Sequence, residues 1–304
     1  MDGIINVYKE AGFTSHDVVA KLRGICRQKK IGHTGTLDPQ ATGVLPVCLG
    51  SATRACEMLT DRTKEYVAEL LLGKITDTQD TTGTVLEERE VAVDEAQVRE
   101  VIGSFVGGYD QIPPMYSALK VNGKKLYELA RAGKEVERQA RHVDLPAIEI
   151  LEIRLPVVKF RVECSKGTYI RSLCADIGGK LGCGGTMQSL VRTRVGEFRL
   201  TDALTLTQLQ ELRDTGRLEE ALLPTDRIFA DFHAVHVEEK WRKLIDNGNA
   251  FYPGQTIEQT TYPVGEWVRV YREDDSFVGI YVYDGAKEWY KPVKIFPSNT
   301  ESRK

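Results

Sequence analysis

The 304-residue sequence predicts an α+β protein that ends in a small, separate β-rich domain. Segments with helical and strand periodicity follow one another through residues 1–228, without the regular strand–helix–strand repeat of a parallel α/β fold. Residues 229–304 carry short apolar runs that are rich in aromatic side chains and separated by turn signals. The hydrophobic fraction of 41% and the charged fraction of 28% are those of an ordinary globular protein, which favours two folded domains over disorder.

The amino-terminal elements follow from capping residues and periodicity. Ser15 is expected to cap a helix that ends in the basic run at 27–30, where cations favour a helix C-terminus. One face of this helix is apolar and contains Val18, Val19, Leu22, Ile25 and Cys26. After a glycine-rich turn we expect a short buried strand at 44–49 and a helix at 51–60.

Later elements are predicted in the same way. Alternation at 63–73 predicts a strand with Tyr66 and Leu70 on the same side, and Asp94 is expected to cap a helix that reaches about Phe105. The remaining elements expected before residue 228 are a short helix at 124–131, strands within 145–164, a helix opened by Thr168, and two helices within 205–222. The second domain is expected to be a small barrel.

Composition excludes several classes of protein. No apolar run approaches the roughly 18–20 residues that span a bilayer, and the acidic start of the chain is unlike a signal peptide, so we expect a cytoplasmic protein. The six cysteines form no CxxC pair and predict reduced thiols rather than a disulfide scaffold. Asp77 and Asp80 precede Gly83 and predict a turn rather than a metal site, so no metal is expected.

The charge is unevenly distributed along the chain. The net charge is −3, but residues 1–54 carry +3, residues 117–142 carry +4 and residues 154–199 carry +6. A fold that gathers these three segments would present one positive face, which is what a phosphate backbone requires. Solvated helix faces would give the same pattern, so charge alone leaves nucleic-acid binding open.

The turn between Gly32 and Gly43 is the most informative segment of the sequence. It contains the run Gly-His-Thr-Gly-Thr-Leu-Asp-Pro-Gln-Ala-Thr-Gly, in which Asp38 precedes Pro39. A phosphate-binding loop is excluded because no Lys-Ser/Thr pair follows the last glycine. Asp-Pro also starts ordinary turns, so the local pattern alone leaves both a structural and a catalytic role open for Asp38.

The motifs of residues 3–195 resemble those of the bacterial tRNA pseudouridine-55 synthases, the TruB-type pseudouridine synthase family. The resemblance starts at the 32–46 turn and continues in family order. Its further motifs are Lys64-Glu65-Tyr66, Thr76-Asp77-Thr78-Gln79-Asp80, the 112–120 segment with Pro113-Pro114, Gly123-Lys124-Lys125-Leu126-Tyr127, the 164–173 segment with Tyr169 and Arg171, and Ser189-Leu190-Val191-Arg192-Thr193. The resemblance implies a catalytic domain at 1–228 on a mixed, mainly antiparallel sheet, and a PUA-like RNA-binding domain at 229–304.

The resemblance implies three catalytic residues. Asp38 matches the family's nucleophilic aspartate, Tyr66 the tyrosine that stacks on the target uracil and is a candidate for the C5 proton transfer, and Arg171 the arginine paired with the aspartate. Chemistry supports these roles, because a carboxylate beneath a base loses solvation and an arginine partner keeps it charged. Whether the carboxylate attacks C6 of uracil or C1′ of the ribose stays open.

Four further positions are implied as substrate-binding residues. His33 matches a histidine that helps to hold the T loop open, Leu190 an apolar wall of the base pocket, and Tyr169 a contact near that pocket. Lys9 matches a lysine near the site, although it is followed here by Glu10 where the family usually has proline.

The expected activity is therefore isomerisation of uridine to pseudouridine in the T arm of tRNA, by a monomer that uses no cofactor. Exchange of an N-glycosidic for a C-glycosidic bond needs no redox equivalent, and the base must be flipped out of its loop. Two alternatives remain: an RNA-binding protein without catalysis, and a hydrolase that uses Asp38 on a small substrate. The hydrolase would need a water-activating His or carboxylate, which no motif supplies.

Overall fold

The computed structural model describes residues 1–121 and 123–297. Its main feature is an eight-stranded sheet with the order β1-β3-β13-β4-β12-β11, to which β2 is added beside β3 and β14 beside β13. These strands are β1 (Gly3–Lys9), β2 (Ile31–His33), β3 (Thr42–Leu49), β4 (Lys64–Leu72), β11 (Ala147–Arg154), β12 (Val157–Cys164), β13 (Gly185–Val195) and β14 (Phe198–Arg199). Within this sheet the short β13–β3 ladder is parallel and the other ladders are antiparallel, which confirms the predicted mixed, mainly antiparallel sheet.

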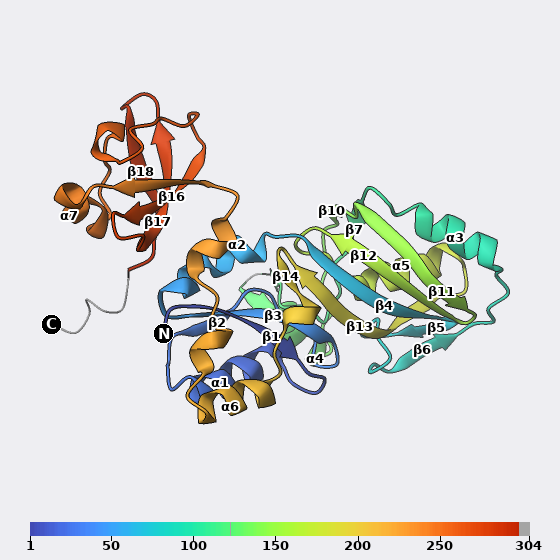
Figure 1. Ribbon diagram of the computed structural model, residues 1–304. Coiled ribbons are helices and arrows are strands. Elements are labelled where there is room, and N and C mark those ends of the chain that lie inside the picture. Colours follow the sequence, from blue (N-terminus) through green and yellow to red (C-terminus); the bar gives the residue numbers. More distant parts are fainter. Residues whose placement is uncertain (122, 298–304) are drawn as a thin grey trace.

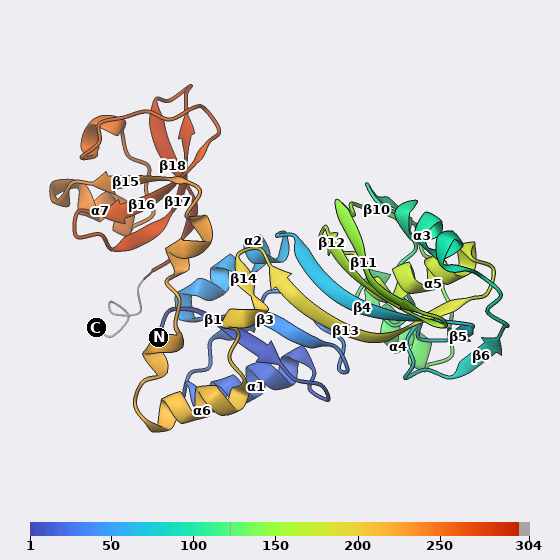
Figure 2. The same ribbon diagram turned by 45° about the vertical axis from the view of Figure 1, so that its right-hand side comes forward.

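Helices cover the two halves of the sheet (Figures 1 and 2). The helices α1 (Ser15–Ile25) and α6 (Leu206–Asp214) lie together against the β1–β3 half and share an apolar core with β1 and β3. The helices α3 (Glu95–Gly103) and α5 (Ile170–Lys180) pack on the β4–β12 half, where alternate residues of β4 are buried as predicted. The alternation fits a strand with one face on a core and one face nearer to solvent.

Short elements connect these layers. The remaining helices are α2 (Cys56–Thr60), α4 (Leu126–Arg131) and α7 (Arg242–Asp246), with 3₁₀ turns η1 (Gly50–Ala55), η2 (Leu200–Asp202), η3 (Leu218–Ala221), η4 (Thr225–Phe229), η5 (Glu239–Trp241) and η6 (Pro253–Gln255). Three two-stranded pairs are β5 (Lys74–Thr76) with β6 (Val85–Glu88), β7 (Tyr109–Gln111) with β10 (Arg141–Val143), and β8 (Lys120–Val121) with β9 (Lys124–Lys125). The helix expected at 124–131 therefore starts only at Leu126, and the one expected at 51–60 is divided into η1 and α2.

Two predicted helix starts are wrong by one or two residues. Thr14, not Ser15, caps α1: its side chain accepts from the backbone N–H of Asp17 in a capping box. The Ser15 hydroxyl is instead engaged by a distant segment, since it accepts from the backbone N–H of Leu37 at 2.9 Å. In α5 the cap position is Tyr169, and Thr168 lies just before it.

The carboxyl-terminal region forms one four-stranded sheet. Its strands are β15 (His233–Val237), β16 (Trp267–Arg272), β17 (Phe277–Asp284) and β18 (Trp289–Ile295), paired in that order. No ladder of described residues joins β18 back to β15, so the β-rich prediction is confirmed but the closed barrel is not. A core shared with the large sheet anchors this region, because Phe229, Ile280 and Phe296 pack in one cluster with Ile4 and Val44.

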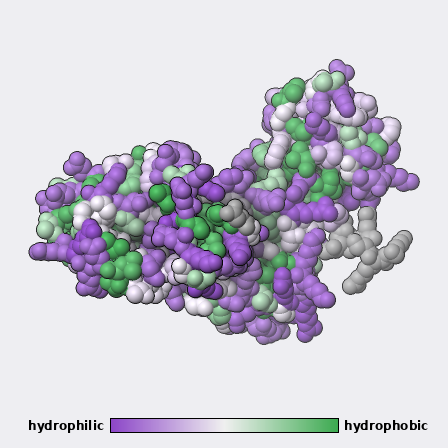
Figure 3. All heavy atoms as spheres, turned by 180° about the vertical axis from the view of Figure 1, so that it is seen from behind, coloured by the Kyte–Doolittle hydropathy of each residue, from purple (hydrophilic) through white to green (hydrophobic). Residues whose placement is uncertain are grey.

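The surface opposite to the view of Figure 1 is mostly hydrophilic, with hydrophobic residues in scattered patches (Figure 3). Within the described residues, no helix is long and apolar enough to cross a membrane. All six cysteines are free thiols, as predicted.

The β4–β12 half should dominate stability. Phe160 in β12 is fully buried between β4, β11 and the helices. Phe160→Ala leaves a cavity and should lower the free energy of unfolding by about 3–5 kcal/mol. Leu86→Ala is the control, because Leu86 is 65% exposed and its truncation should change stability by less than about 0.5 kcal/mol. Urea denaturation of both variants measures this, and equal effects would contradict the assigned core.

Candidate active site

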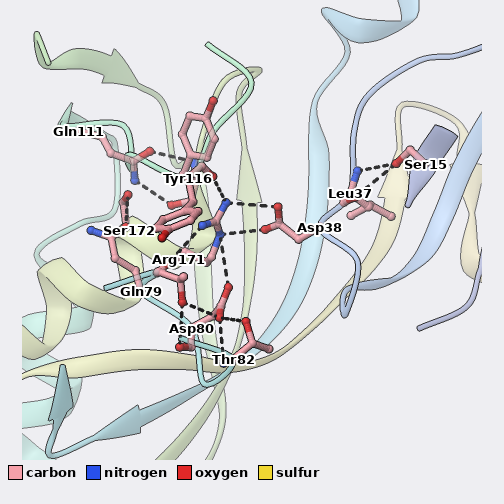
Figure 4. Close-up of polar contacts among 12 residues, drawn as sticks. Ser15, Leu37, Asp38, Gln79, Asp80, Thr82, Gln111, Tyr116, Arg171 and Ser172 are labelled. Atoms are coloured by element: carbon pink, nitrogen blue, oxygen red, sulfur yellow. Dashed lines mark hydrogen bonds and ion pairs between the residues drawn. The ribbon is translucent and has the colours of Figure 1, made fainter. Parts of the chain in front are cut away.

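The structure brings Asp38 and Arg171 into direct contact, although 133 residues separate them (Figure 4). Asp38 lies in the loop between β2 and β3, and Arg171 lies in the first turn of α5. The guanidinium binds both carboxylate oxygens, with Nε 2.8 Å from Oδ2 and Nη2 3.2 Å from Oδ1. The Arg171 side chain is 5% exposed and that of Asp38 39%, so the carboxylate is held from the protein side and open on its other side.

The remaining directions of the guanidinium are also filled. Arg171 donates to the carbonyl oxygens of Thr78 at 3.0 Å and Tyr116 at 2.8 Å, and its Nε lies 3.9 Å from a carboxylate oxygen of Asp80. Asp80 also accepts from the Thr82 backbone, as expected of a turn. Two carboxylates and two carbonyls thus surround one buried cation, which fixes the Asp38 carboxylate in position.

This turn depends on an unusual backbone conformation. Gln79, between Thr78 and Asp80, has φ +63°, in the left-handed region that non-glycine residues seldom occupy. Its side-chain oxygen accepts from the Ser172 hydroxyl at 2.8 Å, and its carbonyl accepts from the backbone N–H of Met187. Contacts to α5 and β13 therefore hold the conformation that directs the Thr78 carbonyl at Arg171.

Tyr66 and Leu190 form an apolar wall next to Asp38. Tyr66 lies in β4 and Leu190 in the neighbouring strand β13, and both belong to the apolar cluster that contains Leu37. At 8% exposure each, they are the least buried members of that cluster. Burial raises the pKa of the Tyr66 phenol, and the Arg192 guanidinium beside it opposes that rise. The wall places an apolar surface beside a carboxylate.

The loop that carries Asp38 is braced from two sides. Ser15 binds the backbone of Leu37, the residue before Asp38 (Figure 4). Lys9, fully buried at the end of β1, donates to the carbonyls of Pro39 at 3.0 Å and Ala41 at 2.6 Å. Burial lowers the pKa of Lys9 to about 8, while the Asp38 charge opposes this shift, so the ammonium form predominates at neutral pH. Lys9 is therefore placed to support the loop.

His33 lies at the end of β2 and is held in its neutral form. Its Nδ1 accepts from the Gly35 backbone N–H at 3.3 Å, and its ring meets that of His16 edge-on at 5.2 Å. Burial lowers the pKa of His33 to about 4, and the neighbouring His16 ring and Arg192 guanidinium add to this shift. With Nδ1 accepting, Nε2 carries the proton, so His33 offers a ring face and one N–H donor rather than a cation.

Tyr169 contributes mainly through its backbone. Gln111, 1% exposed, accepts from the Tyr169 N–H at 2.8 Å and donates to its carbonyl at 3.0 Å. These two hydrogen bonds fix the start of α5 and thereby the position of Arg171, which follows Tyr169 by two residues. Burial also raises the pKa of the Tyr169 phenol.

The structure adds residues to which no role at the site was given from sequence. These are Gln79 and Asp80 in the turn, Gln111 at the start of α5, Ser15 at the loop, and Arg192 in β13. Asp80 and Arg192 lie inside recognised motifs, so their position could have drawn attention, whereas Gln111 and Ser15 act through backbone contacts that leave no pattern. Across the described residues, no group of three or more His, Cys, Asp or Glu side chains is arranged to hold a metal.

The neutral state of His33 has a consequence for stability. Between pH 6.5 and about 4 the unfolded state binds more protons than the folded state, so the free energy of unfolding falls as the pH falls through this window. His33→Gln should reduce the loss between pH 7.5 and 5 by on the order of 1 kcal/mol. Urea denaturation at both pH values measures this, with His142→Gln, 63% exposed, as the control. An unchanged pH dependence in His33→Gln would contradict the neutral state.

Family models match most of this architecture. Residues 23–170 match the model of the TruB family pseudouridylate synthase amino-terminal domain, and residues 171–230 match that of the tRNA pseudouridylate synthase B carboxyl-terminal domain. The Asp38 loop and Tyr66 lie in the first match, and Arg171 opens the second.

Relatives and solved structures agree with these matches. A protein named tRNA pseudouridine synthase B from Lachnoclostridium phytofermentans is 53% identical to this chain, in an alignment that covers 97% of this chain and 100% of the relative. The protein of the same name from Alkaliphilus oremlandii is 48% identical, and the alignment covers 97% of each chain. A chain in an H/ACA ribonucleoprotein bound to a substrate RNA containing 2′-deoxyuridine superposes with a TM-score of 0.74 at 27% identity, covering 98% of this chain and 86% of that one. The chain therefore belongs to the TruB family of tRNA pseudouridylate synthases, which confirms the family and the isomerase predicted from sequence.

Proposed function

We propose that this enzyme isomerises the uridine at position 55, in the T loop of tRNA, with Asp38 as the nucleophile. The observation that carries the proposal is the Asp38 carboxylate itself, held by a buried arginine on one side and open on the other beside an apolar wall. The names of the relatives support tRNA as the substrate. The T arm as the partner, a monomeric enzyme, and a cytoplasmic location belong to the same proposal.

The chemistry requires a base that has left its stack. Flipping the uridine out of its loop costs a few kcal/mol, and stacking on an aromatic ring such as Tyr66 returns about 1–3 kcal/mol. Leu190 would add an apolar contact on the same wall, while His33 and Tyr169 would contact the RNA near the opened loop. A neutral His33 suits stacking and donation better than a contact that needs a positive charge.

The reaction itself is an internal exchange of bonds. Asp38 attacks either C6 or C1′, and the C1′–N1 bond breaks. The base then turns and C5 joins C1′. The bond to Asp38 breaks as C5 joins if the attack was on C1′, or by elimination afterwards if it was on C6, which returns the free carboxylate. The proton of C5 is lost while N1 gains one, so that atoms and electrons balance without an oxidant or cofactor. Arg171 keeps the attacking carboxylate charged and oriented, and the Tyr66 phenol is the candidate acceptor of the C5 proton.

The division of the chain is part of this proposal. Residues 1–228 would form the catalytic domain and residues 229–304 a PUA-like RNA-binding domain, whose last seven residues lie outside the described structure. The core shared by Phe229, Phe296 and Val44 would hold the second domain in a defined orientation toward the RNA.

Asp38→Asn tests the nucleophile. The amide keeps the shape of the carboxylate but cannot form the bond, so pseudouridine formation in a T-loop hairpin should fall at least about a thousandfold while the Kd for the hairpin stays within about threefold. Release of tritium from [5-³H]uridine measures product, and a fluorescent hairpin measures binding. Asp61→Asn is the control, since that carboxylate is 60% exposed and pairs with Lys166 at the surface. Retained turnover would refute the nucleophile, and loss of binding with activity would make Asp38 an RNA contact.

Arg171→Lys tests the arginine. A lysine ammonium cannot bind both carboxylate oxygens and two carbonyls at once, so the single-turnover rate should fall by about a hundredfold or more, which is about 2.7 kcal/mol of transition-state stabilisation. Arg194→Lys serves as the control because Arg194 forms its own ion pair with Glu163 at 3.0 Å. Equal single-turnover rates for Arg171→Lys and Arg194→Lys would contradict the proposed role of Arg171.

A further inference from the structure

Arg192 in β13 is a buried cation without an acidic partner. It is 1% exposed, and none of the ion pairs among the described residues includes it. Its charge is solvated by backbone carbonyls: Nε donates to Val44 at 2.7 Å and Nη2 to Gly35 at 3.1 Å. A buried charge of this kind is costly, and an apolar side chain of similar length would avoid that cost.

The two carbonyls that Arg192 binds lie at the two ends of one segment. Gly35 precedes and Val44 follows the loop segment that carries Asp38. The Arg192 side chain therefore connects the two ends of this loop through hydrogen bonds. The backbone of β13 is equally close, because a Cβ added at Gly43 would lie 2.1 Å from the Arg192 carbonyl oxygen. The parallel β13–β3 contact, which pairs Arg192 with Gly43, therefore brings the loop against β13.

Arg192 also reaches Tyr66. The two residues are register partners in the antiparallel β4–β13 ladder. The Arg192 guanidinium lies beside the Tyr66 phenol, whose pKa burial raises and this nearby cation holds back. One side chain therefore touches both the nucleophile's loop and the ring proposed to stack on the base.

We propose that Arg192 is a positioning residue that fixes the Asp38 loop relative to the Tyr66 ring. The inference rests on the proposed function, because a base must fit between the carboxylate and that ring. A displacement of about 1 Å between reacting groups can cost a hundredfold in rate. The planar guanidinium binds two carbonyls in fixed directions while it lies beside Tyr66, which a lysine ammonium, a compact point charge on a flexible stem, does not reproduce.

Two variants of Arg192 and one control test the proposal. Arg192→Met removes the buried charge together with both hydrogen bonds to carbonyls, and Arg192→Lys keeps a cation that can form only part of these contacts. Arg194→Met is the matched control two residues along the same strand, where the arginine pairs with Glu163 instead. Single-turnover tritium release at saturating enzyme, the Kd for the T-loop hairpin, and Tm are measured for each.

We expect Arg192→Met to lose about a hundredfold in rate, Arg192→Lys about tenfold and Arg194→Met less than threefold, with every Kd within about threefold of wild type. A rate for Arg192→Met within threefold of wild type would overturn the proposal, as would parallel losses of rate and binding. If Arg192→Met does not fold, Arg192→Lys decides by the same criteria, and failure of both to fold would make Arg192 a stability residue only. A wild-type enzyme inactive on the hairpin would instead refute the proposed function.

Discussion

The site depends on one buried guanidinium. Arg171 has almost no contact with solvent and must find its partners in the protein, and it finds them in three other segments: the Asp38 loop, the turn at 78–80 and the carbonyl of Tyr116. Because a buried arginine without partners is costly, these segments are tied to the start of α5. The same contacts leave the outer side of the Asp38 carboxylate free for a substrate.

A second group of contacts keeps this assembly in place. Lys9 binds carbonyls inside the Asp38 loop, and Ser15 binds the backbone N–H of the residue before Asp38. Gln111 binds the backbone just before Arg171. All three side chains are buried, and each holds backbone groups, although Gln111 also donates to the Tyr109 hydroxyl. Loops rigidified in this way hold reacting groups in position without reorganisation at the moment of reaction.

Local patterns predicted many of the elements, although not the strands β1 and β13, and they did not predict how the elements meet. The alternation in β4 and the Asp94 cap of α3 were predictable, because period and capping are properties of neighbouring residues. The contact of Asp38 with Arg171 could be expected only from the family resemblance, since nothing local connects them. The start of α1 was misplaced because Thr14 and Ser15 can both cap a helix, and only the distant Leu37 decides which one does. Arg192 lies in a recognised motif but was given no role, because charged side chains are seldom fully buried and nothing local indicates that this one is.

The carboxylate held by Arg171 is proposed to isomerise one uridine of the T loop. The most direct test of this claim is to map pseudouridine along a full-length, unmodified tRNA transcript after incubation with the wild-type protein and a metal chelator. We predict a single pseudouridine, at position 55, in stoichiometric yield. A transcript that remains unmodified there, or that carries pseudouridine only at other positions, would contradict the claim.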